Sequence, residues 1–296
     1  MQVTRERLVA LRSELPRRIR GQDEPLDRLM RAIERRELQA VPQLGPRSSF
    51  LFAGPTGVGK TESAEVIAEV LFDQRELLRI DCSEYQTLAS FEGLLGNRSG
   101  YRGRLGTAYD RCPYGIWLWD EIEKAHPNLI HLFLQMSGAA RLTLACGDSL
   151  DLRGFYLIVT SNLGSAEIIG RDHLTFTSLE RHVVRCIEQY FRPELLGRFE
   201  YPFVFRPLSR KAQAEITEQH FRQVLAYQQQ LGRQVRFEPE VLSFLIHRGF
   251  SPRLGARRLL HFIHQSVGDA VAANLLAGGT GTGSLIVNGE RLILNA

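Results

Sequence analysis

The stretch SFLFAGPTGVGKT, residues 49–61, decides the fold of this chain. Residues 54–61 match the pattern G-x-x-x-x-G-K-[ST] at every fixed position. The apolar run before them predicts a strand, and the residues that start at Lys60, KTESAEVIAEVLF, predict a helix. A strand, this pattern and a helix in succession are the context of a P-loop, which binds the phosphates of a nucleotide.

The residue types in this loop explain how it would hold a nucleotide. Its glycines let backbone N–H groups converge on phosphates, and the following helix adds its positive end. We expect Lys60 to reach the β- and γ-phosphates and the Thr61 hydroxyl to coordinate Mg²⁺. The predicted nucleotide-binding residues are therefore Gly54, Pro55, Thr56, Gly57, Val58, Gly59, Lys60 and Thr61.

A second part of the site follows the apolar run GIWLWDE, residues 115–121. It places Asp120 and Glu121 at the carboxyl end of a predicted strand, where open α/β sheets bind their ligands. We expect Asp120 to hold Mg²⁺ through a water molecule and Glu121 to polarise the attacking water. Together with the P-loop, this pair favours nucleotide hydrolysis over binding alone.

Short apolar runs alternate with helical stretches up to about residue 208, which indicates a parallel sheet covered on both faces. We predict an α/β domain over residues 1–206, with up to five strands. The runs are SFLFAG (49–54), LLRIDCS (77–83), GIWLWDE (115–121), GFYLIVTSN (154–162) and YPFVFRP (201–207).

From residue 207 to residue 296 the pattern becomes mainly helical. Helices are predicted within residues 209–232, 239–249 and 256–278, with Gly232 as a stop signal for the first. Near the end, Asn288 and Gly289 stand between apolar runs, which predicts a β-hairpin. We expect a smaller helical domain that ends in this hairpin.

Composition restricts the class of protein further. The 296 residues are 44% hydrophobic and 24% charged, with a formal net charge of +4, which is typical of a soluble globular protein. No apolar run reaches the roughly 18 residues of a membrane span, and the start shows no signal-peptide core, so we expect a cytoplasmic protein. The histidines form no evident ligand cluster. Neither a zinc site nor a disulfide framework is expected, because no short paired spacing links Cys82, Cys112, Cys146 and Cys186.

Several motifs together resemble the Clp-type AAA+ ATPases, above all the second ATPase module of the ClpB and ClpA unfoldases. The likeness runs from about residue 12 to the end. It implies a P-loop AAA+ fold with a five-stranded parallel sheet, an ATP hydrolase that uses Mg²⁺, and a homo-hexameric ring that threads polypeptide through an axial pore. In chain order the motifs are GPTGVGKT, RIDCSEY, DEIEKAHP, VTSNLGS, FRPELLGRFE, VFRPL and GARRLL.

The resemblance also assigns roles to single positions. It implies that Ile19 and Gly21 line the adenine pocket, and that Asn162 is a polar sensor that orients water near the γ-phosphate. Arg257 would be a second sensor, through which the small domain responds to the γ-phosphate.

The resemblance further implies that Arg198 is an arginine finger acting on the ATP of the neighbouring subunit. The family usually has Asn and Asp where this chain has Gly197 and Glu200, so Arg192 stays open as an alternative finger.

The segment GYRG, residues 100–103, stands where the family carries a substrate-gripping pore loop. The resemblance implies that Tyr101 packs against a threaded polypeptide, held between Gly100 and Gly103, and an aromatic ring needs no particular sequence for this. Arg102 replaces an apolar residue of the family, which predicts a preference for acidic or phosphorylated chains. The segment after it is a few residues shorter than in the family.

Other interpretations stay open at this point. The arginine content would suit a motor or loader that acts on nucleic acid, and a non-catalytic scaffold is a further alternative. Ile169, Gly170 and Arg171 occupy the place of a peptidase-docking tripeptide, but a charge suits a hydrophobic pocket poorly. Since no substrate-receiving domain, first module or middle domain is recognisable, we expect an adaptor, a recruiting assembly or the pore itself to select the client.

Overall fold

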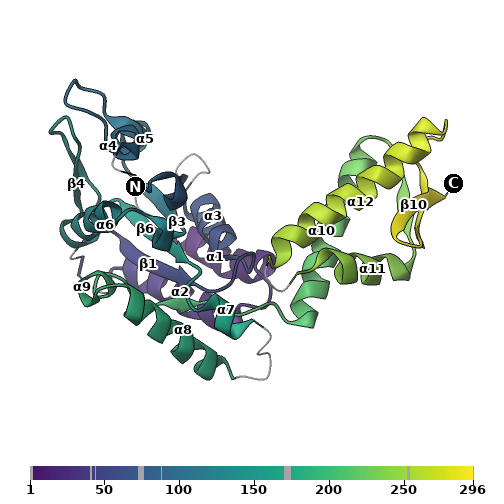
Figure 1. Ribbon diagram of the computed structural model, residues 1–296, viewed down its shortest axis with the longest axis horizontal. Helices are drawn as coiled ribbons and strands as arrows, with labels where there is room; N and C mark the ends of the chain where they lie inside the picture. The colour runs from purple at the N-terminus through teal and green to yellow at the C-terminus, as the bar shows by residue number, and fades with distance from the viewer. Residues whose placement is uncertain are drawn as a thin grey trace. The chain divides into compact units, whose positions relative to one another are not determined.

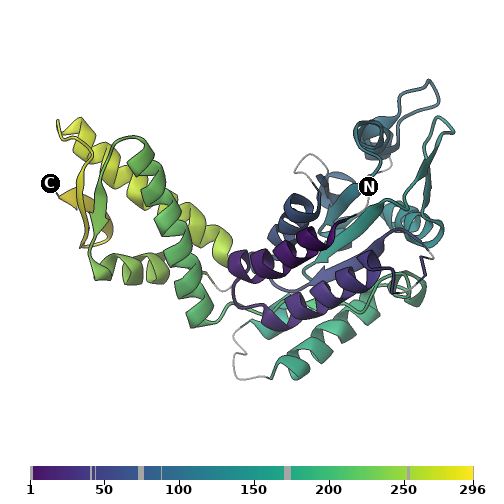
Figure 2. The same ribbon diagram turned by 180° about the vertical axis from the view of Figure 1, so that it is seen from behind.

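The computed structural model describes residues 3–40, 42–43, 45–72, 77–87, 89–169, 175–251 and 254–295. The chain divides into two compact units. The first takes most residues up to Arg206, and the second takes most residues from Pro207 onward, together with Pro55–Val58 of the P-loop. Figures 1 and 2 draw the first unit in purple to green and the second in light green to yellow.

A five-stranded sheet, in the order β2-β3-β6-β1-β7, forms the centre of the first unit. All four neighbouring pairs are parallel, as the resemblance implied. Each of the five predicted apolar runs became one strand, and the prediction of a parallel α/β sheet is confirmed. The strands are β1 (Ser48–Ala53), β2 (Leu77–Asp81), β3 (Gly115–Asp120), β6 (Phe155–Ser161) and β7 (Phe203–Val204).

Helices flank this sheet on both faces (Figures 1 and 2). On one face, Trp117, Trp119 and Leu157 of the strands join buried side chains of α6 and α8 in a single cluster. On the other face, Phe50 and Tyr156 pack ring against ring, with centroids 5.6 Å apart. The flanking helices are α1 (Arg5–Arg18), α2 (Asp23–Glu37), α3 (Lys60–Leu71), α6 (Pro127–Ala139), α7 (Ser165–Ile168), α8 (Phe176–Tyr190) and α9 (Pro193–Leu196).

The register of the sheet brings three strand ends together. Ala53 of β1 pairs with Ser161 of β6, and Trp119 of β3 pairs with Val159 of β6. The P-loop, the Asp120–Glu121 pair and Asn162 therefore leave the sheet at the same edge. This is the edge at which open α/β sheets bind ligands.

Two small projections lie beside each other at one end of the first unit (Figures 1 and 2). One contains α4 (Ser90–Leu95) and α5 (Gly103–Arg111), and the other is an antiparallel hairpin of β4 (Arg141–Thr143) and β5 (Ser149–Asp151). The Ala145 N–H donates a 3.1 Å hydrogen bond to the Leu95 carbonyl, which joins the two. The sequence analysis did not predict this hairpin.

The second unit contains the three predicted helices and the predicted hairpin. Gly232, with φ +78°, follows the first helix, as expected of a stop. An unpredicted third strand, β8 (Val235–Phe237), pairs in parallel with β9 and extends the hairpin to a three-stranded sheet. The remaining elements are α10 (Arg210–Gln230), α11 (Pro239–Gly249), α12 (Ala256–Leu276), β9 (Gly283–Asn288) and β10 (Arg291–Asn295).

The structure also describes the apolar character of the helices and the state of the cysteines. None of the helices within the described residues is both long and apolar enough to cross a bilayer. All four cysteines are free thiols; Cys82 is buried, and Cys112, Cys146 and Cys186 are partly buried.

Phe133 of α6 tests how strongly the packing of α6 on the sheet stabilises the first unit. Its ring is 1% exposed, stacks on Phe199 at 5.1 Å and meets Trp119 edge-on at 6.4 Å. We expect Phe133→Ala to lower the free energy of unfolding by about 3–5 kcal/mol, because it removes buried surface and leaves a cavity.

Denaturant unfolding followed by tryptophan fluorescence measures this effect, since both tryptophans, Trp117 and Trp119, lie in β3 of the first unit. Val9→Ala is the matched control, because Val9 is 64% exposed on α1 and should change stability by less than about 0.5 kcal/mol. Equal effects of the two variants would contradict the assigned packing.

Candidate nucleotide site

The P-loop has a backbone that only glycine can adopt at its two ends. Gly54 has φ +140°, and a Cβ there would lie 2.3 Å from the Phe205 carbonyl oxygen. Gly59 has φ +108°, caps the N-terminus of α3, and leaves no room for a Cβ, which would lie 2.8 Å from Ile19. The loop therefore presents backbone rather than side chains beside the first N–H groups of a helix, which is a geometry suited to anions.

Lys60 connects the P-loop with the end of β6. Its side chain is buried, and its ammonium donates to the Gly54 carbonyl and, at 2.9 Å, to Oδ1 of Asn162. Lys60 and Asn162, which were predicted separately from the sequence, are therefore hydrogen-bonded to each other.

Asp120 lies buried at the end of β3 among donors from three other elements. Its carboxylate accepts hydrogen bonds from the Thr61 hydroxyl at 3.1 Å and from the Thr160 hydroxyl at 2.6 Å. Arg79 of β2 adds an ion pair at 2.7 Å. The Thr61 and Asp120 oxygens form a hard donor pair of the type that Mg²⁺ prefers, so the residues present fit the expected cation.

Three contacts fix the position of Glu121. Oε1 of its carboxylate accepts from the Asn162 side-chain amide at 3.0 Å, and Oε2 pairs with the Lys124 ammonium at 2.5 Å. Its N–H donates to the Thr160 hydroxyl at 3.0 Å. The backbone is left-handed, with φ 57° and ψ 52°, a conformation that is costly for a residue other than glycine and that is found at functional sites.

Sequence reasoning missed three residues of this network: Arg79, Lys124 and Thr160. The hydrogen bond to Glu121 raises the pKa of the Lys124 ammonium above its usual value. Thr160 was open to prediction, because alternate residues of a strand face the same side and Asn162 lies two positions on. Arg79 had no such signal, because its contact depends on β2 lying next to β3.

The two residues assigned to the adenine pocket flank the turn between α1 and α2. Ile19 is buried and lies against Gly59 of the P-loop, where an added Cβ would be 2.8 Å from the Ile19 side chain. Gly21 has φ +72°, which a turn here requires. The structure thus brings Ile19 to the P-loop.

The assigned arginines stand apart from this network. Arg198 and Arg192 are exposed beside α9, and the Arg198 guanidinium lies over Gly138 of α6, where an added Cβ would be 3.2 Å from it. Arg257 is exposed near the start of α12 in the second unit. Within the described part of the chain, none of the three guanidinium groups makes a hydrogen bond or ion pair, so all are available to an external group.

The loop around Tyr101 is ordered by Asn97. The Asn97 N–H donates to the Tyr101 carbonyl at 2.8 Å, and its side-chain oxygen accepts from the Tyr101 N–H at 3.3 Å. Gly100 and Gly103 both have positive φ, which lets the chain reverse on each side. The Tyr101 side chain is 52% exposed at the tip of this projection.

Arg102 is paired with two acidic residues of the same chain. Its guanidinium contacts Asp110 of α5 at 3.0 Å and Asp148 of the β4–β5 hairpin. An acidic or phosphorylated substrate would have to compete with these two carboxylates for Arg102, and the expected preference for such chains stays a prediction. The contact with Asp148 ties the Tyr101 loop to the hairpin beside it. Of the tripeptide considered for peptidase docking, Gly170 and Arg171 lie outside the described residues.

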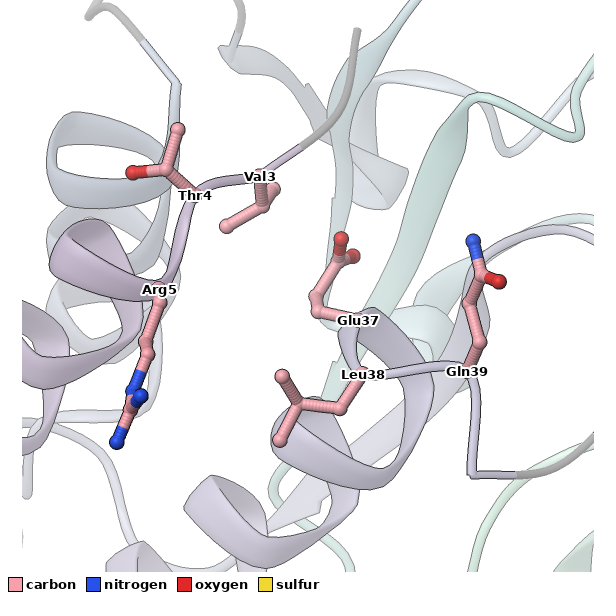
Figure 3. Close-up of a pocket in the computed structure, with 6 residues that line it drawn as sticks. All are labelled: Val3, Thr4, Arg5, Glu37, Leu38 and Gln39. Atoms are coloured by element: carbon pink, nitrogen blue, oxygen red, sulfur yellow. The ribbon is translucent and has the colours of Figure 1, made fainter.

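A separate pocket of about 420 Å³ lies between the start of α1 and the end of α2 (Figure 3). Glu37 lines it, but this carboxylate already accepts from Arg47 at 2.7 Å and from the Tyr156 hydroxyl at 2.6 Å. No residue of the nucleotide network lines the pocket, whose walls are Val3, Thr4, Arg5, Glu37, Leu38 and Gln39.

Taken together, the sheet order, the P-loop and the paired acidic residues define a P-loop ATPase of the AAA+ class. Residues 45–201 match the family "AAA domain (Cdc48 subfamily)", and residues 208–287 match the family "C-terminal, D2-small domain, of ClpB protein". The chain belongs to the AAA+ ATPases and is a module of the Clp type.

Relatives share this similarity over almost the whole chain. It is 37% identical to the chaperone protein ClpB of Meiothermus ruber, over 98% of this chain and 35% of that protein. It is 34% identical to a probable chaperone protein ClpB of Chlorobaculum tepidum, over 95% of this chain and 67% of that protein. The chain thus spans about a third of the length of several curated relatives.

A solved structure agrees with the fold. The chain superposes on Hsp104, in a closed-state cryo-EM reconstruction with ATPγS and FITC-casein, with a TM-score of 0.86 and 30% identity. The match covers 98% of this chain and 52% of the Hsp104 chain. The expected five-stranded AAA+ fold with a helical C-terminal part is confirmed.

Thr160 tests the network at Asp120. Its hydroxyl, on a side chain that is 1% exposed, serves Asp120 and Glu121 at once. We expect Thr160→Val, which keeps the shape and removes the hydroxyl, to lower the free energy of unfolding by about 1–3 kcal/mol, because two buried polar groups lose a partner. Thr143→Val on the exposed side of β4 is the matched control, and a loss no larger than in this control would sink the assignment.

Proposed function

We propose that this chain is an ATP-dependent protein unfoldase or remodelling ATPase that assembles into a homo-hexameric ring and threads polypeptide through an axial pore. Residues 1–206 form its large ATPase domain and residues 207–296 its small domain. The observation that carries the proposal is the continuous network that joins Lys60, Asn162, Glu121, Thr160 and Asp120 at one edge of the sheet.

The residues of this network divide the work of hydrolysis. Lys60 and the P-loop N–H groups would bind the phosphates, while Thr61, and Asp120 through a water molecule, would hold Mg²⁺, which would neutralise charge on the phosphate oxygens. Glu121 polarises the attacking water, and Asn162, within hydrogen-bond distance of both Glu121 and Lys60, orients that water beside the γ-phosphate.

The contacts of Glu121 leave its carboxylate able to meet a water molecule. Asn162 and Lys124 each contact one carboxylate oxygen, and each oxygen has a second lone pair that can accept a hydrogen bond from water. The Lys124 side chain is 49% exposed, so solvent screens its ion pair and makes the contact inexpensive to exchange.

The exposure of the arginines supports assembly into a ring. Arg198 is exposed and makes no hydrogen bond or ion pair with any described residue, so its charge is available to the nucleotide of a neighbouring subunit. In this arrangement each site is completed only by assembly. Arg257 of the small domain acts as the second sensor of the γ-phosphate.

The substrate is a polypeptide. The exposed Tyr101 ring, on a loop fixed by Asn97 and braced by Arg102, offers an apolar face to any extended chain. The similar Hsp104 structure was determined with FITC-casein, which is a protein, and this supports a polypeptide substrate over nucleic acid. A recruiting adaptor or assembly would supply the client.

Subunit mixing tests the finger and the ring in one experiment. We expect Glu121→Gln to bind ATP but lose about 10²–10⁴-fold in turnover, and Arg198→Ala to lose about 10³–10⁵-fold. Mixing the two variants should restore ATPase activity, because Glu121→Gln subunits supply Arg198 to neighbours that retain Glu121. Absence of restoration in mixed rings would rule out action across the interface, and restoration with Arg192→Ala in place of Arg198→Ala would reassign the finger.

Tyr101→Ala tests the grip on polypeptide. We expect it to abolish unfolding of a protein substrate and the stimulation of ATPase activity by casein, with basal turnover retained and Tyr101→Phe active. Tyr227→Ala is the control, because Tyr227 is a similarly exposed tyrosine, 58% against 52%, in the second unit. Stimulation by DNA and not by casein would favour the nucleic-acid alternative instead.

A further inference from the structure

A cluster of metal-ligating side chains lies outside the nucleotide site. Among the residues that the structure describes, Glu167 of α7 and His182 and Cys186 of α8 place their ligand atoms within 4.8 Å of one another. Figure 1 shows these two helices on the first unit. The cluster combines an oxygen, a nitrogen and a sulfur donor.

Local structure explains how the three side chains meet. His182 and Cys186 are four residues apart on a helix, so they share one face. Gly164, just before α7, lets the chain approach α8 closely, because a Cβ there would lie 3.1 Å from the Val183 Cα and 3.3 Å from the Cys186 Cβ. This close approach brings Glu167 to the same face.

The spacing suits a shared ion. The Cys186 sulfur lies 3.7 Å from Nε2 of His182. Zinc–sulfur and zinc–nitrogen bonds at a tetrahedral angle would separate the two ligand atoms by about 3.6 Å. The pair therefore stands near the separation that coordination requires, without a change of helix geometry.

In the part of the chain that the structure describes, contacts with other side chains do not account for the position of these three groups. Within the described residues, the Glu167 carboxylate makes no hydrogen bond or ion pair, and the sulfur–imidazole contact is the interaction recorded between the other two. Burial and the nearby Glu167 carboxylate both raise the pKa of the Cys186 thiol. A cation between the three groups would reverse this effect and displace the thiol proton to solvent.

We propose that Glu167, His182 and Cys186 bind one zinc-like divalent cation. A borderline-soft ion suits this mixed donor set, whereas Mg²⁺ and Ca²⁺ prefer oxygen alone. Three protein ligands leave one position for water, on the side where Glu167 is exposed. The bound cation would fasten α7, which follows Asn162 closely in sequence, to α8. The site is independent of the proposed unfoldase function.

Metal titration of the full chain without nucleotide tests the site. Zn²⁺ alone, in excess Mg²⁺ and in competition with a chromophoric chelator, should bind with one equivalent and raise the Tm. Co²⁺ should give the charge-transfer absorption of a thiolate ligand. Cys186→Ser should abolish this absorption, and it and His182→Ala should each weaken Zn²⁺ binding by about tenfold or more, since even outer-shell partners contribute that much.

Three further variants separate this site from other sources of binding. Cys112→Ser and Cys146→Ser, at the two other partly buried thiols, should leave affinity and absorption unchanged. Glu167→Gln changes an exposed side chain, so it should fold normally and still weaken binding. Unchanged affinity in both Cys186→Ser and Glu167→Gln would overturn the proposal, as would Co²⁺ absorption that depends on Cys112 or Cys146.

Discussion

Burial of the Asp120 carboxylate is the constraint on which the rest of the first unit depends. A charged group at the inner end of a strand is costly unless donors surround it. The donors come from three separate elements: Arg79 from β2, Thr61 from α3 and Thr160 from β6. They reach Asp120 only when β2, β3 and β6 adopt the observed order and register, so the charge and the topology require each other.

The ion pair between Arg79 and Asp120 is partly open to solvent. The Arg79 side chain is 47% exposed, whereas the Asp120 side chain is 8% exposed, so solvent reaches the cation side of the pair. Such a pair contributes little net stability, because screening and side-chain ordering offset the attraction. Arg79 therefore occupies one Asp120 oxygen at small cost, and a divalent cation could share or replace this contact.

The secondary-structure elements that were predicted from the sequence are those whose pattern lies within one continuous stretch of residues. The five apolar strands and the three helices of the second unit were predicted because their periodicity is local. The β4–β5 hairpin and β8 were missed, because strands of three residues carry too short a pattern.

In the candidate site, too, residues within local motifs were predicted and contacts between separate strands were not. Lys60, Thr61 and Asp120 lie in motifs and were found, but Arg79 was not, since its partner lies on another strand. The ion pair between Arg102 and Asp148 was missed for the same reason, because Asp148 lies on the unpredicted hairpin. The spacing of His182 and Cys186 was visible in the sequence, but without Glu167 beside them it carried no signal of a metal site.

The Thr160 hydroxyl links Asp120 and Glu121 by hydrogen bonds, in addition to the peptide bond that joins these two residues. It donates to the Asp120 carboxylate and accepts from the Glu121 N–H, so one oxygen sets both the side chain of the first and the backbone of the second. That N–H belongs to the residue with left-handed φ, where a cost of about 1–3 kcal/mol must be offset by surrounding contacts. A shift of the Asp120 carboxylate would therefore also disturb, through this hydroxyl, the contact that holds the Glu121 backbone, so the positions of the proposed metal ligand and the proposed base depend on each other.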